Sequence, residues 1–268
     1  MVREGRVTIG GRQSRYIEAG SGWPVVLIHA FPLNAEMWRP VLDRVPAGWR
    51  YIAPDLRGLG PGGAAAEGPV TMADYAADTV ALLDALEIDE AVIGGLSMGG
   101  YVTLAMFRAA PERFSGVVLA DTRPQADTEA GRDGRRRLLG LAREGGVSAV
   151  VEDMLPKLLG DTTRRKRPQV AGEVRAIASM NSTGAVAAAI EAMMRRPDST
   201  DLLGKMSRPA LVVVGEEDAL TPRADADGMQ RLLPRSRLVE IPGAGHLSAM
   251  EDPEAFASAL ADFLGANM

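Results

Sequence analysis

Short apolar runs alternate with longer amphipathic stretches along most of the chain. Some of the runs, such as residues 25–28 and 211–214, are apolar at every position. A strand has that pattern when helices cover both faces of its sheet, because neither face then meets water. On this basis we predict strands at residues 12–19, 25–30, 50–55, 90–95, 116–121, 210–215 and 237–241.

The stretches between these runs carry signals of helix starts and ends. Thr71 and Asp74 have the spacing of a capping pair, Asn34 can cap a second helix, and Pro253 suits the first turn of another. We predict helices at residues 34–45, 71–86, 98–110 and 252–264. Strands that alternate with helices indicate an α/β fold with a mostly parallel, doubly wound sheet.

One long segment breaks this alternation. Residues 122–207 show helical patterns and no convincing strand, and they are too many for a structureless loop in a compact domain. We therefore predict a core domain of residues 1–121 and 208–268, with residues 122–207 inserted as a helical lid. A Gly-rich loop at residues 58–63 continues into three alanines at 64–66, and no helix pattern opens directly from its glycines, so we discount nucleotide binding there.

The amino-acid composition says more about possible binding partners than about the fold. The 268 residues are 46% hydrophobic and 24% charged, and the net charge of -5 gives no general attraction to nucleic acid or to an anionic membrane. Two basic runs, residues 135–137 and 164–167, lack the aromatic residues of a nucleic-acid site, so we interpret them as solvated helix faces. With no Cys, no secretory stretch and no apolar run of membrane-spanning length, we expect a cytoplasmic protein.

The strongest chemical motif is Gly95-Leu96-Ser97-Met98-Gly99, where a predicted buried strand gives way to a helix. A nucleophile on such a sharp turn has a strained backbone and needs small neighbours, which the two glycines provide. The turn raises the serine hydroxyl above the sheet, next to the free N–H groups of the helix N-terminus. We predict that Ser97 is a nucleophile.

A serine nucleophile needs a base, which is usually histidine. The chain has only two histidines, His29 and His246. Each one follows a predicted strand, and functional loops gather at the carboxyl ends of the strands in a doubly wound sheet. Position in the sheet therefore allows either histidine.

Four segments of the chain resemble the α/β-hydrolase superfamily. They are His29-Ala30-Phe31-Pro32, Asp55-Leu56-Arg57-Gly58-Leu59-Gly60, Gly95-Leu96-Ser97-Met98-Gly99-Gly100, and Gly215-Glu216-Glu217-Asp218 together with Gly243-Ala244-Gly245-His246. The resemblance covers nearly the whole chain outside residues 122–207. Within the superfamily the chain looks like the small capped enzymes that include 3-oxoadipate enol-lactonases, carboxylesterases and cofactor-free haloperoxidases.

The resemblance implies which groups complete the triad, because α/β-hydrolases carry it in the chain order serine, acid, histidine. Only His246 follows Ser97, so it is the expected base. The acid that fits best is Asp218, just after the strand at 210–215. Asp121 is the alternative acid, and Glu216 and its neighbour lie too early in the turn.

The resemblance also implies an oxyanion hole formed by the backbone N–H groups of Phe31 and Met98. The chain departs from the family by having Ala30 where glycine is usual, and alanine would be strained there if the position required a positive φ. For His29 we expect a structural role, with its ring hydrogen-bonded to the neighbouring loop.

These expectations lead to a hydrolase that acts on a small carboxylic ester or lactone, without a cofactor or a metal. Trp38 and Leu220 are expected to contact the substrate, with core packing as the alternative, and Asp55 and Arg57 to order a loop. The same triad also suits peroxide as the acceptor, as in haloperoxidases and perhydrolases, or carbon–carbon bond hydrolysis. A non-catalytic small-molecule receptor is a further alternative, against which the intact triad argues.

Overall fold

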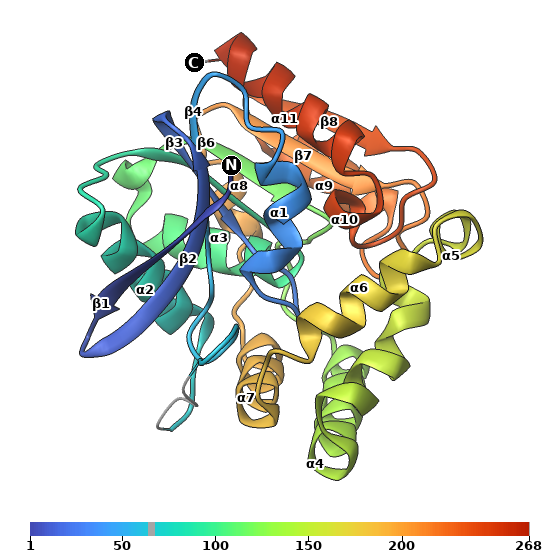
Figure 1. Ribbon diagram of the computed structural model, residues 1–268. Coiled ribbons are helices and arrows are strands. Elements are labelled where there is room, and N and C mark those ends of the chain that lie inside the picture. Colours follow the sequence, from blue (N-terminus) through green and yellow to red (C-terminus); the bar gives the residue numbers. More distant parts are fainter. Residues whose placement is uncertain (64–67, 268) are drawn as a thin grey trace.

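The computed structural model describes residues 1–63 and 68–267. A single sheet of eight strands crosses the molecule in the order β1-β2-β4-β3-β5-β6-β7-β8 (Figure 1). The strands are β1 (Arg3–Ile9), β2 (Arg12–Gly20), β3 (Gly22–Ile28), β4 (Gly48–Pro54), β5 (Ala91–Leu96), β6 (Phe114–Ala120), β7 (Ala210–Gly215) and β8 (Ser236–Ile241). The Gly-rich loop is described up to Gly63. The three alanines that follow it, at 64–66, lie outside the described residues.

The sheet is mostly parallel, as predicted. From β4 to β8 every neighbouring pair is parallel, whereas β1 and β2 add antiparallel at one edge. The seven predicted strands are present, with ends that differ by at most three residues. The additional strand β1 is a half-exposed edge strand without an apolar run, so its hydrophobic pattern gave no signal.

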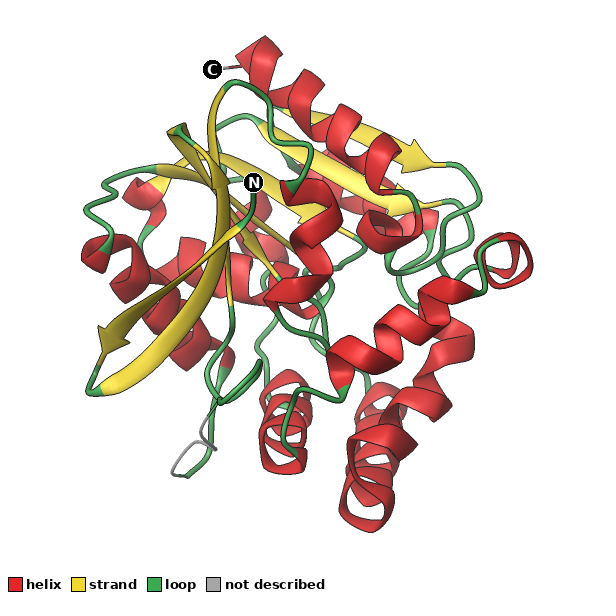
Figure 2. Ribbon diagram, viewed as in Figure 1, coloured by secondary structure: helices red, strands yellow, loops and turns green. Residues whose placement is uncertain are grey.

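Alternate residues of the central strands enter two separate cores, one on each face of the sheet. Val26 and Ile28 pack in one core, and Val25 and Leu27 pack in the other. Helices α2 (Met72–Ala85), α3 (Met98–Ala109) and α9 (Arg223–Leu232) cover the first face, and α1 (Arg39–Leu42) and α11 (Pro253–Asn267) cover the second (Figure 2). The two cores explain why β3 and β7 are apolar throughout.

Four of these helices were predicted, and their start signals act as expected. At the start of α2, the Thr71 side chain accepts from Asp74 N–H, and the Asp74 side chain accepts from Thr71 N–H. At the start of η1, the Asn34 side chain accepts from Glu36 N–H. The stretch predicted as one helix at 34–45 is a short 3-10 turn, η1 (Ala35–Trp38), followed by α1. Helix α9 was not predicted, and it buries only Ala226 and Met229. The remaining short helices of the core domain are η2 (Pro111–Arg113) and α10 (Ser248–Glu251).

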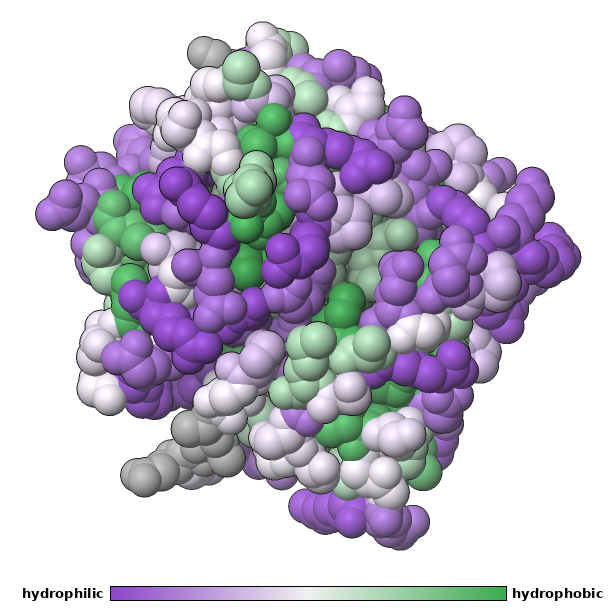
Figure 3. All heavy atoms as spheres, viewed as in Figure 1, coloured by the Kyte–Doolittle hydropathy of each residue, from purple (hydrophilic) through white to green (hydrophobic). Residues whose placement is uncertain are grey.

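Residues 122–207, all of which the structure describes, contain five helices and no strand. We call this segment the cap. Its helices are α4 (Glu129–Leu158), α5 (Asp161–Lys166), α6 (Gln169–Ala178), α7 (Thr183–Met194) and α8 (Thr200–Leu203). In the space-filling view, apolar residues show over part of the cap and also in strips over the sheet domain, between hydrophilic residues (Figure 3).

A break in α4 lets the cap follow both cores. Gly146 has a φ of 67° in the middle of α4, which interrupts the helix. Before the break, Leu138 and Leu139 join the core that contains α2 and α3. After it, Leu155 and Leu158 join the core that contains α11. The cap therefore packs on the sheet domain as a continuation of its two cores.

Candidate active site

Ser97 stands in a strained turn between β5 and α3. Its backbone has φ 56° and ψ -112°, a conformation that L-residues rarely adopt. A Cβ atom on Gly95 would lie 2.4 Å from the carbonyl carbon of Gly99, and one on Gly99 would lie 2.1 Å from the Ile28 oxygen. Only glycine fits at either position, so the backbone can make this turn and present the serine side chain above the sheet.

The structure brings Ser97, His246 and Asp218 together. His246 Nε2 lies 2.8 Å from Ser97 Oγ, and His246 Nδ1 lies 2.9 Å from Asp218 Oδ2. Asp218 lies in the loop after β7, and His246 lies in the loop after β8. Both side chains are buried, whereas Ser97 is half-buried. This continuous chain of hydrogen bonds is the geometry in which a carboxylate orients an imidazole toward a hydroxyl.

The surroundings of Asp218 favour its ionised form. Burial by itself would raise the pKa of this carboxyl, but the charge and hydrogen bond of His246, together with hydrogen bonds from Thr221, hold the pKa below its ordinary value. The Thr221 hydroxyl donates at 2.6 Å, and the N–H groups of Leu220 and Thr221 donate at 2.8 and 2.9 Å. Asp218 therefore stays charged beside the imidazole.

Asp121, the alternative acid, occupies a different place. It accepts hydrogen bonds from the backbone of Gly215 and from the hydroxyl of Ser248, and it has no hydrogen bond to His246 in the described structure. Burial, and then the nearby charge of Asp218, raise its pKa well above the ordinary value. Asp121 links the end of β7 to the loop that follows His246.

His29 is fully buried and engages both ring nitrogens with backbone. Nδ1–H donates to the Ala30 oxygen at 3.0 Å, and Nε2 accepts from Leu56 N–H at 3.1 Å. Burial lowers its pKa to about 4, so the ring is neutral at neutral pH. His29 thus joins the loop after β3 to the loop after β4, which is the structural role expected for it.

The N–H groups of Phe31 and Met98 have no hydrogen-bond partner among the described residues. Met98 is the first residue of α3, where the free N–H groups and the helix dipole favour a negative charge. Ala30 is not strained, because the positive φ angles of non-glycine residues in the described ranges are confined to Glu87, Ser97 and Asp121. The substitution of alanine for the usual glycine is therefore compatible with this loop.

Comparison with known proteins identifies the family of the chain. The family described as the alpha/beta hydrolase fold matches residues 24–253. The chain belongs to the α/β-hydrolase family. It is 37% identical to a thermophilic esterase from Thermogutta terrifontis, solved with malate bound, with a TM-score of 0.92 and 98% of each chain covered.

Two curated relatives carry other names. The α/β-hydrolase chain is 26% identical over 232 residues to 3-oxoadipate enol-lactonase 2 of Acinetobacter baylyi, covering 87% of this chain and 85% of that protein. It is 30% identical over 263 residues to a Synechocystis protein provisionally named a non-heme chloroperoxidase, covering 90% and 92% respectively. The relatives of this chain are therefore named for different reactions.

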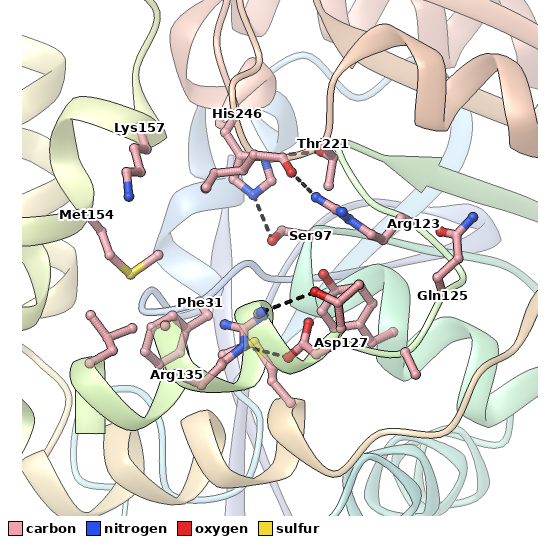
Figure 4. A pocket seen from close by; sticks show the side chains of 18 of the residues that line it. Phe31, Ser97, Arg123, Gln125, Asp127, Arg135, Met154, Lys157, Thr221 and His246 are labelled. Atoms are coloured by element: carbon pink, nitrogen blue, oxygen red, sulfur yellow. Dashed lines mark hydrogen bonds and ion pairs between the residues drawn. The ribbon is translucent and has the colours of Figure 1, made fainter. Parts of the chain in front are cut away.

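In this α/β-hydrolase, Ser97 and His246 line a cavity of about 450 Å3 between the sheet domain and the cap (Figure 4). Its floor is formed by Ser97, His246, Thr221 and Leu220, and Phe31 lies beside them. We call the lining residues from 122–207 the cap wall; among them are Arg123, Gln125, Asp127, Arg135, Arg137, Leu138, Asp153, Met154 and Lys157.

Trp38 does not belong to this cavity, which corrects our expectation for it. Its side chain is fully buried and packs against Phe256 of α11, with ring centroids 5.5 Å apart. The loop after β3 turns Phe31 toward the cavity, whereas η1 turns Trp38 into the core on the other face. Leu220 lines the cavity, and its contact with the substrate stays a prediction.

The basic run at residues 135–137 is only partly a solvated helix face. Arg135 and Arg137 line the cavity, and only Arg136 points away from it. Arg135 pairs with Asp127 at 3.0 Å, and Arg137 donates to both oxygens of Asp153 at 2.7 Å. No sequence pattern marked these residues, because which side of α4 faces the triad depends on its packing.

The cap is fastened to the loops that carry the site. Leu158 O accepts a hydrogen bond from Leu247 N–H, next to His246. Asn181, between α6 and α7, donates to the Pro32 oxygen and accepts from Gly60 N–H, and so joins two loops of the core domain. Asp55 and Arg57 order their loop by joining it to neighbouring elements: Asp55 accepts from Ala35 N–H of η1, and Arg57 donates to Asp78 of α2.

Residues 1–63 and 68–267 hold no cluster of three or more acidic or histidine side chains suited to a metal ion. Within the same ranges, every helix is too short or too polar to cross a membrane.

Proposed function

We propose that this α/β-hydrolase cleaves a small carboxylic ester or lactone through an acyl-enzyme on Ser97. The observation that carries the proposal is the continuous hydrogen-bond chain from Asp218 through His246 to Ser97, at the floor of a cavity. In the first step, His246 Nε2 takes the Ser97 proton while Oγ attacks the substrate carbonyl carbon. The collapse of the tetrahedral intermediate expels the alcohol, which receives that proton from His246.

Water completes the reaction. His246, neutral again, takes a proton from a water molecule, and the resulting oxygen nucleophile attacks the acyl carbon. The Ser97 oxygen leaves and regains its proton from the imidazolium. Asp218 stays ionised throughout, orients His246 through Nδ1–H and stabilises the imidazolium. The mechanism needs neither a cofactor nor a metal.

The unpaired N–H groups of Phe31 and Met98 would stabilise the oxyanion that forms on the carbonyl oxygen. Because these N–H groups donate to no other acceptor, they can bind the oxyanion of the transition state without breaking an existing hydrogen bond. The position of Met98 at the start of α3 adds the positive end of the helix dipole.

Residues 122–207 would act as a lid that selects the substrate, while residues 1–121 and 208–268 carry the reaction. The triad comes from loops of the core domain alone, whereas the cap supplies the larger part of the cavity lining. A lid of this kind excludes water and shapes the acyl pocket without entering the chemical step.

Hydrogen peroxide is a second acceptor to consider, because one relative of 30% identity is provisionally named a non-heme chloroperoxidase. The same acyl-enzyme would then be attacked by peroxide in place of water, and the product would be a peracid. Both reactions form the acyl-enzyme with the same residues. The identity of the triad residues therefore does not distinguish hydrolysis from peracid formation.

The proposal is tested by assaying the purified protein with 4-nitrophenyl acetate and with a small lactone, each with and without peroxide. We expect hydrolysis of at least one of them, and its loss in Ser97→Ala with unchanged circular dichroism. Peracid formation faster than hydrolysis would favour the second acceptor. Activity that persists in a folded Ser97→Ala variant would contradict the acyl-enzyme.

A further inference from the structure

A turn of the cap contacts both loops that complete the triad. It joins α4 to α5, and we call it the clasp, residues 158–162. In Figure 1 it lies next to the orange and red loops that follow β7 and β8, which carry Asp218 and His246. The clasp residues lie outside the cavity lining, so contact with a substrate does not account for them.

The backbone of His246 depends on its neighbours for its place. Among the described residues, its own N–H group and carbonyl oxygen make no hydrogen bond. The nitrogen of the next residue, Leu247, lies 3.1 Å from the Leu158 oxygen in the clasp and 3.1 Å from Glu251 Oε1. Glu251 Oε2 accepts from Gly160 N–H of the clasp at 2.9 Å. Glu251 therefore joins the residue after His246 to the clasp.

The contact around Glu251 is close and buried. Glu251 is fully buried, so both of its oxygens depend on these N–H partners, and the N–H groups depend on them. A Cβ atom on Gly245 would lie 2.2 Å from the Gly160 nitrogen. The backbone of the clasp thus touches the backbone directly before His246, and only glycine fits at that point.

The clasp also holds the loop that carries Asp218. Glu217, the residue before Asp218, accepts from Thr162 N–H at 2.8 Å and from the Thr162 hydroxyl at 2.5 Å. These bonds hold the pKa of the Glu217 carboxyl below its ordinary value, so it is ionised at neutral pH and binds the clasp as a carboxylate. Glu217 N–H donates in turn to the Ala244 oxygen at 2.7 Å, which joins the two loops directly.

We propose that Glu251 and the clasp position His246 between Asp218 and Ser97, which makes Glu251 a positioning residue of the triad. The hydrogen bond from His246 to Asp218 joins two separate loops, so it depends on how those loops lie relative to each other. The clasp is bound to both. This inference rests on the proposed ester or lactone hydrolysis, and it gives the cap a task besides the selection of the substrate.

Positioning and simple stabilisation predict different results. If the contact only stabilised the fold, loosening it would reduce the folded fraction, and the molecules that remained folded would keep the wild-type kcat. If it positions His246, a fully folded variant is slow, because a misplacement of about 1 Å at a reacting group can cost about 10²-fold in rate. The loss should then fall on kcat and be equal for every ester, since His246 acts on all of them.

The main variant is Glu251→Gln, which keeps the size of the side chain but turns an NH2 group toward one of the backbone N–H groups. We expect kcat for 4-nitrophenyl acetate and 4-nitrophenyl butanoate to fall about tenfold, with KM changed less than about twofold. Thr162→Val removes only the hydroxyl bond to Glu217 and should lower both kcat values about threefold. The matched controls are the exposed Glu254→Gln on α11 and Thr183→Val on α7, which should keep wild-type kinetics.

Nuclear magnetic resonance of the histidine rings gives a readout that needs no turnover. The chain has two histidines, so isotope-labelled histidine gives one set of ring signals for His246 and one for His29. In Glu251→Gln the Nδ1 proton of His246 should exchange with water faster than in the wild type, because its bond to Asp218 is held less firmly. The His29 ring, bonded to two other loops, should keep its signals and so report an intact fold.

The results separate the two proposals. A folded Glu251→Gln variant with low kcat, an altered His246 signal and unchanged His29 signals would support the positioning role. Wild-type kcat in that variant, a change in KM alone, or an unchanged His246 signal would overturn it. If Glu251→Gln does not fold, Thr162→Val is judged by the same criteria. If the wild type hydrolysed no ester or lactone, the proposed function would fail alone, and the ring signals would still decide whether the clasp positions His246.

Discussion

The floor and the wall of the cavity are built in different ways. On the floor, Ser97, Asp218 and His246 stand directly after β5, β7 and β8, in loops whose backbones are held by hydrogen bonds and close glycine contacts. The cap wall consists of long side chains on helices outside the sheet, and its arginines are half-exposed or exposed. Rigid placement suits a reaction, whereas an adjustable polar wall suits the choice of substrate.

The largest expected change in activity comes from substituting one of two neighbouring buried carboxylates beneath the floor, Asp218 and Asp121. Asp218→Asn should lower kcat by about 10⁴-fold, because the amide cannot hold the His246 tautomer or stabilise the imidazolium. Asp121→Asn should cost far less, because Asp121 bonds Gly215 and Ser248 and has no hydrogen bond to His246 in the described structure. Steady-state kinetics of both variants on one ester measures the difference. If the two losses came out in the opposite order, Asp121 would be the triad acid.

A second prediction concerns acid stability, which buried groups of the core domain such as His29 should control more than the solvated cap wall. The pKa of His29 is lowered to about 4 in the folded protein, whereas an unfolded histidine titrates near ~6.5. Between these values the unfolded state binds more protons, so stability rises with pH and is lost as pH falls through this window. The loss reaches about 3 kcal/mol below pH 4.

Urea unfolding of the wild type and of His29→Gln at several pH values between 7 and 4 tests this contribution. Other acids titrate in both proteins, so their effect cancels in the difference. The stability advantage of the wild type should shrink by about 3 kcal/mol over the window. A difference that stays constant with pH would show that His29 is not held neutral.

Two glycine variants compare the close packing of the floor with the open packing of the cap. Gly99→Ala should destabilise the protein by about 1–3 kcal/mol or more, because its Cβ would meet the Ile28 oxygen at 2.1 Å. Gly172→Ala on α6 meets nothing within 4 Å and should stabilise its helix by about 0.5–1 kcal/mol. Denaturant unfolding measures both. Similar values for the two variants would argue against a tightly constrained elbow.

The smallest expected effect lies on the cap wall. Met154→Ala should alter KM for long acyl chains by a few-fold and leave 4-nitrophenyl acetate nearly unaffected, because the side chain lines the cavity without entering the triad. Kinetics over acyl chains of two to eight carbons measures the change. The same proportional loss on every ester in a folded variant would place Met154 in the chemistry and remove the distinction between floor and wall.

The comparison also explains what the sequence could predict. The floor follows local rules: glycines two residues on either side of Ser97, and polar residues directly after apolar strand runs, identify positions that the sheet then brings together. The cap wall follows no such rule. Arg135 and Arg137 line the cavity because of how α4 packs, with the adjacent Leu138 and Leu139 in the core, and no local pattern shows this packing.

Two further misses have similar causes. Strand β1 is a polar edge strand that pairs on one side only, so it lacks the apolar pattern of the inner strands. Trp38 lies seven residues after Phe31, and nothing in that spacing shows that η1 turns it into the opposite core. In both places tertiary contacts decide what the local sequence leaves open.

The central claim, an activated Ser97, is tested most directly by labelling with a fluorophosphonate at neutral pH and mapping the modified peptide by mass spectrometry. The account predicts modification of Ser97 alone, because among the described serines only its hydroxyl is hydrogen-bonded to an imidazole, at 2.8 Å, and free N–H groups lie beside it. His246→Ala should nearly abolish the labelling while circular dichroism stays unchanged. Modification spread over several serines, or labelling of Ser97 that persists unchanged in His246→Ala, would contradict the account.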